Sequence, residues 1–155
     1  MPKFSTTQRV RHSADEMFDL VADVERYPEF VPFCRELKVR RRAPGEGQTE
    51  ILTADMTVAY KLIREKFTSR VTLDRPRQQI FVEYLSGPFS RLDNRWMFRP
   101  VDDHLCDVDF YISYEFRSRA LGFIMGAMFD IAFRCMVGAF ERRADLIYAQ
   151  RAAQT

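Results

Sequence analysis

Residues Asp23 to Cys34 read DVERYPEFVPFC, a proline-rich and aromatic stretch that follows an amphipathic segment and is called the elbow below. Surface turns favour Gly, Asn, Asp and Ser, which reach turn dihedrals or bond their own backbone. The elbow instead places six apolar or ring-bearing side chains within residues 27–33. Because Pro28 and Pro32 fix φ and restrict the residues before them, we predict a short, stiff helical turn. Such bulk either plugs a core or guards the mouth of a cavity.

The composition is that of a globular protein rich in adaptable apolar side chains. With 155 residues the chain fits one domain over residues 1–155, since single cores commonly reach about 150 residues. Aromatic residues make up 14%, with 14 Phe and 7 Met, which suits the filling or lining of a large apolar space. A net charge of +2 is too mild to argue for nucleic acid, and we expect no DNA partner. Membrane and ribosome partners stay open.

The cysteines and the N-terminus indicate a reducing compartment. Cys34, Cys106 and Cys135 are odd in number and form no C-x-x-C pair, so we predict reduced core thiols rather than disulfides or a zinc site. The start of the chain lacks the features of a signal peptide. We therefore expect a protein of the bacterial cytoplasm, with peripheral contact at the inner membrane as an open alternative.

The most apolar run, residues 120–133, contains Asp130 and is followed by Arg134. A membrane-spanning helix needs about 20 apolar residues. We expect that this segment does not cross a bilayer.

The pattern of elements begins with a strand and a helix and continues as a meander. Residues 4–10 alternate as a strand does, and Ser13 and Glu16 form a capping box that opens a helix ending near Asp23. Six further strands are predicted after the elbow, at residues 36–42, 50–63, 67–74, 79–85, 91–98 and 106–116.

The strand at 50–60 alternates apolar and polar side chains, so one sheet face is predicted to be dry and the other mostly wet. Asp55 lies on the wet face, and we expect its carboxylate to meet water. From Ser118, a candidate N-cap, no Pro interrupts a helix predicted to reach about Ala149, roughly 45 Å long. Asp130 lies off its inward stripe and is expected to face water. That stripe comprises Met125, Phe129, Ala132, Met136, Phe140, Ala144 and Ile147.

This order predicts an α+β helix-grip fold: a curved antiparallel sheet of about seven strands around a long C-terminal helix, with two short helices after the first strand. Between sheet and helix this architecture encloses an apolar cavity with few polar groups. The short helices and hairpin tips edge its mouth, where the elbow is expected to lie.

Three stretches carry a family resemblance: FDLVADVERYPEFVPFC (18–34), LKVRRR (37–42) and RWMFRP (95–100). Together they resemble the coenzyme Q-binding members of the START-like, polyketide cyclase/dehydrase superfamily, and the match covers nearly the whole chain. The bacterial relatives in this family include proteins named ribosome association toxins. Family members often carry Trp where this chain has Phe33, so no indole N–H donor stands there.

The resemblance implies a non-enzymatic protein that binds ubiquinone or a similar polyprenyl lipid and supports respiratory electron transfer as a carrier or chaperone. Ubiquinone would be a bound ligand and not a catalytic cofactor. The alternative is a ribosome-binding toxin that blocks association of the ribosomal subunits. An apolar tunnel suits an isoprenoid tail, because each buried CH₂ contributes about 0.8 kcal/mol.

The candidate ligand-binding residues come from the elbow, two strands and the long helix. The alternative is that they are ordinary hydrophobic core residues with no role in ligand binding. They are Tyr27, Phe30, Val31, Pro32, Phe33, Met56, Trp96, Phe98, Met125, Met128 and Phe129.

Catalysis is not indicated. His12 and His104 are the only histidines, neither has a recognisable partner in sequence, and we expect both to be solvated. No phosphate loop, dinucleotide motif or zinc-protease motif occurs. We predict no enzyme, no catalytic residue and no metal site, although related cyclases use the same kind of cavity and fold alone does not exclude catalysis.

Three basic clusters carry alternative interpretations. Charges on strands usually form a solvated face or protect an edge. If the clusters converge near the cavity mouth, each basic residue close to an anionic membrane adds about 1 kcal/mol of attraction. They would also suit ribosomal RNA, although no aromatic RNA-binding motif accompanies them. The clusters are Lys38, Arg40, Arg41 and Arg42, then Lys61, Arg64, Lys66 and Arg70, then Arg117 and Arg119.

Overall fold

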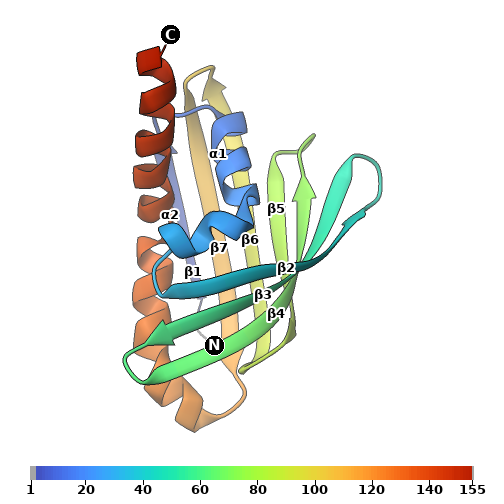
Figure 1. Ribbon diagram of the computed structural model, residues 1–155, viewed down its shortest axis with the longest axis vertical. Coiled ribbons are helices and arrows are strands. Elements are labelled where there is room, and N and C mark those ends of the chain that lie inside the picture. Colours follow the sequence, from blue (N-terminus) through green and yellow to red (C-terminus); the bar gives the residue numbers. More distant parts are fainter. Residues whose placement is uncertain (1–2, 155) are drawn as a thin grey trace.

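A curved antiparallel sheet wraps around one long helix in the computed structural model of the chain, which describes residues 3–154 and the side chains up to residue 148 (Figure 1). Its elements are β1 (Lys3–Val10), α1 (Ala14–Ala22), the 3₁₀ helix η1 (Val24–Glu29), β2 (Cys34–Pro44), β3 (Thr49–Tyr60), β4 (Ile63–Asp74), β5 (Gln79–Ser86), β6 (Phe89–Asp102), β7 (Leu105–Phe116) and α2 (Arg119–Gln154).

The sheet has the strand order β1-β7-β6-β5-β4-β3-β2, so consecutive strands from β2 to β7 pair as a meander and β1 returns to β7. In Figure 1, β2, β3 and β4 run across the front while β1, β6 and β7 stand behind them, which is how the curvature encloses space. The predicted helix-grip fold is confirmed. Some predicted strand boundaries were wrong. The strand from residue 50 ends at Tyr60, because residues 61–62 form a hairpin turn, and Ile63 rather than Phe67 opens β4. The strand predicted at 91–98 is longer and spans Phe89–Asp102.

The capping box predicted for the first helix is confirmed. The Ser13 hydroxyl accepts a hydrogen bond from the Glu16 backbone N–H at 3.0 Å, and the Glu16 carboxylate accepts one from the Ser13 backbone N–H at 3.0 Å. Two orphan N–H groups at the helix start are thereby satisfied. α1 then buries Met17, Phe18 and Val21 against the sheet.

The long helix begins as predicted, with the Ser118 hydroxyl accepting a hydrogen bond from the Leu121 backbone N–H. Its predicted inward stripe is confirmed: five members are buried, while Met136 and Ile147 are half-buried. By length and composition α2 would also suit a membrane span, since its most apolar window has a mean hydropathy of 1.7, and 33% of that window is buried in the fold. The expectation that α2 does not cross a bilayer stays a prediction.

The expectation that His12 is solvated was wrong. Its side chain is buried, and its Nε2 lies 2.6 Å from the Asp145 carboxylate on α2. The Tyr148 hydroxyl donates to the Glu16 backbone carbonyl at 2.8 Å beside it. These contacts tie the start of α1 to the end of α2, and a separation of 133 residues hides them from sequence reasoning. His104 is exposed in a turn, as expected.

Asp55 also departs from expectation, because its carboxylate is 7% exposed although it lies on the outer sheet face. It accepts a hydrogen bond from the Thr68 hydroxyl at 2.6 Å and pairs with Arg40 at 3.3 Å and Lys66 at 3.6 Å. Long basic side chains on neighbouring strands bury their stems along a surface and keep the charge outside, and here they cover the carboxylate. Asp130 faces water as expected, where it pairs with Arg134.

The three thiols divide into two classes, which corrects the prediction of three core cysteines. Cys34 and Cys106 are buried, and burial raises the pKa of each thiol to about 11. Cys135 is exposed, because it lies on the outward side of α2.

We predict that a maleimide at pH 8 modifies one thiol per native chain. The thiolate is the nucleophile, and a pKa about three units above the solution pH leaves only about one thiolate in a thousand at Cys34 and Cys106. Mass spectrometry should locate the single adduct at Cys135, and guanidinium should expose the other two. Fast modification of a Cys135→Ser variant in its native state would contradict this division.

Candidate functional site

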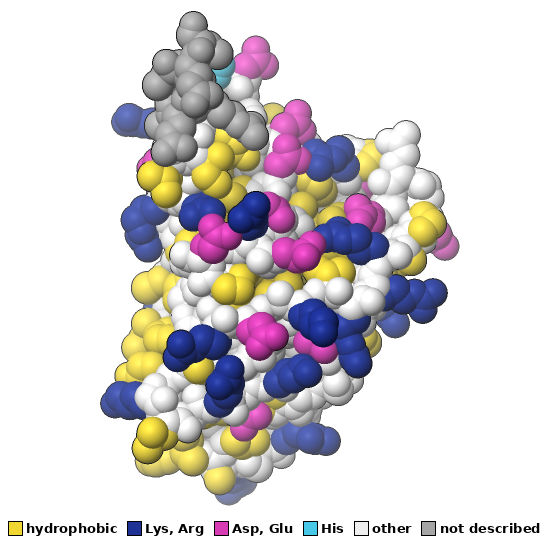
Figure 2. Space-filling view, viewed as in Figure 1, with side chains coloured by type: hydrophobic (Ala, Val, Ile, Leu, Met, Phe, Trp, Pro, Cys, Tyr) yellow, Lys and Arg dark blue, Asp and Glu magenta, His cyan; other side chains and the backbone are white. Residues whose placement is uncertain are grey.

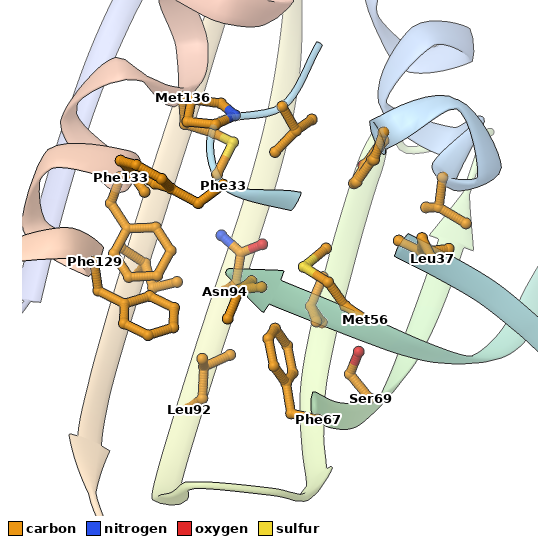
Figure 3. Close-up of a pocket in the computed structure, with 18 of the residues that line it drawn as sticks. Phe33, Leu37, Met56, Phe67, Ser69, Leu92, Asn94, Phe129, Phe133 and Met136 are labelled. Atoms are coloured by element: carbon orange, nitrogen blue, oxygen red, sulfur yellow. The ribbon is translucent and has the colours of Figure 1, made fainter. Parts of the chain in front are cut away.

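An apolar cavity of about 110 Å³ lies between the concave sheet face and α2 (Figure 3). Its sheet wall is built from alternate, inward-pointing strand residues, and its helix wall from the inward stripe of α2. The elbow closes one side. Residues that show the three walls in Figure 3 are Met56, Phe67 and Leu92 on strands, Phe129 and Phe133 on α2, and Phe33 on the elbow.

Most of the predicted site residues lie in one place. Eight of the eleven line the cavity, although they come from segments as distant as the elbow and α2. Whether they contact a ligand stays a prediction. The eight are Tyr27, Val31, Pro32, Phe33, Met56, Trp96, Met128 and Phe129.

Three predicted residues do not line the cavity. The Phe30 ring packs edge-on against Phe140 at 4.9 Å, so it belongs to the contact between elbow and helix. Phe98 is buried and its ring stacks against Trp96 at 6.1 Å. Met125 is fully buried among the core residues. The sequence patterns placed each of them in the core, but such patterns do not decide which core side chains reach the cavity.

Two polar side chains in the cavity were missed. Asn94 on β6 and Ser69 on β4 are both buried among its lining residues. The Asn94 amide nitrogen donates to the Tyr111 backbone carbonyl at 2.8 Å, and Figure 3 shows the side chain pointing into the cavity. The sequence could have indicated Asn94, because it alternates with Leu92 and Trp96 and therefore lies on the same inward strand face.

The elbow is held rigidly on the side that meets the helices. The Tyr27 hydroxyl donates to the Val21 backbone carbonyl, and the Tyr27 ring packs edge-on against Phe140 at 5.3 Å. Burial raises the pKa of this phenol far above its ordinary value. The predicted helical turn is confirmed as η1, whose last residue, Glu29, accepts a hydrogen bond from Arg143 on α2 at 2.7 Å. Arg143, followed by Arg26, lowers the pKa of the Glu29 carboxyl.

The other end of the elbow is strained and borders the opening. Phe33 has φ 63°, a left-handed conformation that is costly for a side chain with a Cβ. Its carbonyl accepts a hydrogen bond from Ala59 on β3 at 3.0 Å, and its ring packs edge-on against Tyr60 at 5.2 Å. Phe33 and Met136 are lining residues that are not fully buried, and they lie near each other in Figure 3. The mouth therefore lies between the elbow and α2.

The cavity can form hydrogen bonds, but its described lining contains no charged side chain. None of its described lining residues is Asp, Glu, His, Cys, Lys or Arg. Among the described residues, no group of three His, Cys, Asp or Glu side chains is placed to hold a metal ion. The arrangement suits binding of an apolar molecule with a few polar atoms.

Residues 10–141 match the protein family described as polyketide cyclase / dehydrase and lipid transport. Among curated proteins, the ribosome association toxin RatA of Escherichia coli K12 is 33% identical over 151 residues, which cover 97% of this chain and 92% of the toxin. The coenzyme Q-binding protein COQ10 homolog B of Xenopus laevis is 29% identical over 153 residues, which cover 96% of this chain and 60% of that protein.

A similar solved structure is the solution structure of an 18 kDa protein from Caulobacter crescentus. It is 33% identical to this chain, with a TM-score of 0.77 and coverage of 96% of this chain and 99% of the other.

We predict that Phe33→Gly is more stable than Phe33→Ala by about 1 kcal/mol, because glycine adopts the left-handed conformation without a Cβ penalty. Urea unfolding of both variants measures the difference. Since both lose the ring at the mouth, an apolar fluorescent dye such as anilinonaphthalene sulfonate should enter both faster than it enters the wild type. Equal stability of the two variants would contradict the strained backbone, and unchanged dye entry would contradict the position of the mouth.

Proposed function

The chain belongs to the polyketide cyclase / dehydrase and lipid transport family, and from this premise we propose that it binds ubiquinone or a similar polyprenyl lipid. In this proposal the protein catalyses no reaction and supports respiratory electron transfer as a carrier or chaperone. The observation that carries the proposal is the enclosed apolar cavity, into which Asn94 and Ser69 bring a small number of polar atoms.

The two polar residues suit a quinone head group. A ring carbonyl accepts hydrogen bonds, and the Ser69 hydroxyl is a donor among mostly apolar lining side chains. The Asn94 amide adds a donor and an acceptor beside it. A ligand that left these buried groups unpaired would lose affinity, so they favour a head group with carbonyl oxygens over a plain hydrocarbon.

The size of the cavity indicates how the ligand enters. Drug-sized ligands occupy pockets of about 300–1,000 Å³, whereas this cavity measures about 110 Å³. Binding therefore requires side chains to move aside. Met56, Met128 and Met136 are flexible thioethers on its walls, and Phe33 is the strained ring at its mouth. An isoprenoid tail displaces such side chains at low cost and gains about 0.8 kcal/mol per buried CH₂.

The described lining residues include the hydroxyls of Ser69 and Tyr27 but no Asp, Glu, His, Cys, Lys or Arg that could activate them, and this supports a binding role. The names of the two curated relatives, a toxin and a coenzyme Q-binding protein, also describe binding rather than catalysis. On this proposal ubiquinone is the cargo and no cofactor takes part. The place of action is the cytoplasmic side of the inner membrane, where the quinone pool is reached.

We predict saturable binding of a short-tailed ubiquinone in detergent below its micelle threshold. Asn94→Leu should weaken it about five- to tenfold, the value of one hydrogen bond, without weakening a tail-only hydrocarbon. Ser69→Ala should weaken it less, and Ser90→Ala, a matched change at an exposed serine on β6, not at all. Absence of quinone binding by protein shown to be folded by circular dichroism would refute the proposal.

A second function, ribosome binding, is favoured by the identity of 33% to the ribosome association toxin, against 29% to the coenzyme Q-binding relative. The outer face of β2–β4 is the surface for it, because its basic side chains are exposed there as expected. That face is also mixed in charge, because Asp55 pairs with Arg40 and Lys66.

Sucrose gradients of ribosomal subunits distinguish the two functions. On the carrier proposal we expect that a stoichiometric amount of the protein leaves subunit association unchanged. A toxin would shift intact ribosomes to free subunits, and the double variant Arg40→Glu with Lys66→Glu would abolish the shift while Asn94→Leu would not. A shift with that pattern would establish the second function in place of the first.

A further inference from the structure

Two apolar side chains are almost wholly exposed at one end of the molecule. Leu62 at the β3–β4 tip is fully exposed, and Phe123 in the first turns of α2 is 91% exposed. Ile124 beside it is more than half exposed. Single exposed apolar residues are ordinary on protein surfaces. A leucine and a phenylalanine in such full exposure at one end form a surface with no partner in the described chain.

Turn geometry does not explain the residues at the β3–β4 tip. Tyr60 pairs with Ile63, so Lys61 and Leu62 make a two-residue hairpin turn. Lys61 has φ 56°, a position at which such turns favour Gly, Asn or Asp. The turn instead holds a cation and a fully exposed leucine. Residues that break a local rule without a local gain point to a functional requirement.

The first half of α2 is apolar on both of its sides. One side is the stripe that faces the sheet. The opposite side carries exposed residues three to four apart, interrupted only by Asp130, which pairs with Arg134. This explains why only 33% of the most apolar stretch of α2 is buried in the fold. The outward stripe comprises Ala120, Phe123, Ile124, Ala127 and Ile131.

The β3–β4 tip and the start of α2 lie at the same end of the longest axis, opposite the β6–β7 turn and the end of α2 (Figure 1). Figure 2 shows hydrophobic side chains along this end of α2, with Lys and Arg side chains next to them. The tip is also connected to the cavity mouth. Lys61 lies over the Tyr60 ring at 5.2 Å, and that ring packs against Phe33 at 5.2 Å.

The charges next to the exposed apolar residues are basic, and the nearest acidic residues in sequence are Glu65, Glu115 and Asp130. Residues 117–129 contain Arg117 and Arg119 and no acidic residue, and residues 60–64 contain Lys61 and Arg64 and no acidic residue. A surface that combines protruding apolar side chains with a cationic border fits an anionic bilayer, because apolar groups enter the acyl boundary while the cations meet lipid phosphates. An RNA base can stack on an exposed phenylalanine, but RNA offers no apolar partner for a fully exposed leucine. A symmetric second copy would bring the arginines of both chains together.

From these observations we infer that this end of the molecule docks onto an anionic phospholipid bilayer. Leu62 and Phe123 enter the interface, and Lys61, Arg117 and Arg119 contact the headgroups. Docking places the β3–β4 tip in the bilayer. Because Tyr60 at this tip contacts Phe33 at the cavity mouth, the cavity then opens toward the lipid. The inference deepens the proposed function by naming the route of the cargo and rests on it in that respect, but docking itself requires no bound quinone.

The test uses sucrose-loaded vesicles of phosphatidylcholine with about one third phosphatidylglycerol, sedimented with the full chain free of quinone. Leu62→Glu and Phe123→Glu should each lower binding about tenfold or more, the loss expected for one large apolar side chain. The matched controls are Val101→Glu near the β6–β7 turn and Leu146→Glu near the end of α2, both exposed and both at the opposite end. They should bind like the wild type.

A second readout reports insertion directly. In Leu62→Trp the new indole should shift its emission to the blue on vesicle addition, whereas Val101→Trp should not shift, and the native Trp96 is buried in both. The inference is overturned if the wild type does not sediment with these vesicles, if all four glutamate variants bind alike, or if the same tip variants instead abolish a dimer or a ribosome complex. Because no quinone is present, failure here is distinct from failure of quinone binding.

Discussion

A single helix is too narrow to cover the concave face of a seven-stranded sheet, and the rest of the structure follows from this constraint. Six strand spacings of about 4.8 Å give a face roughly 29 Å wide, whereas a helix with its side chains is about 10 Å across. The sheet reduces the mismatch by curving, and α1 and the elbow fill one end. Phe140 joins these layers, since the rings of Tyr27, Phe30 and Trp96 all pack edge-on around it. The space left uncovered is the cavity.

The elbow resolves two demands that conflict at the edge of such a space. It must exclude water from an apolar chamber, and it must leave a route into it. Its first half meets the former demand through the Tyr27 hydrogen bond and the pair between Glu29 and Arg143. Its second half carries the strained Phe33, held by one backbone hydrogen bond and one ring contact. Strain of this kind persists where the surrounding structure imposes it and often marks a functional position.

The sheet separates two chemically different surfaces, and this explains how one family includes both a coenzyme Q-binding protein and a ribosome association toxin by name. The inner face and α2 form the apolar cavity. The outer face carries exposed basic residues organised around the buried carboxylate of Asp55. Because different side chains form the two surfaces, binding functions on the same fold can diverge independently.

Local pattern in the sequence determined the elements, the dry face of each strand and the inward stripe of α2, because these depend on periodicity within a few residues. Eight of the residues predicted to bind a ligand line the cavity, since elbow, strand and helix positions that face the core converge in a helix-grip fold. Only the tertiary structure decided which apolar side chains reach the cavity and which, like Phe30 and Met125, are covered by others. It likewise decided that His12 meets Asp145 and that neighbouring strands cover Asp55. Those contacts join residues far apart in the chain, and their distances arise from packing, which periodicity does not encode.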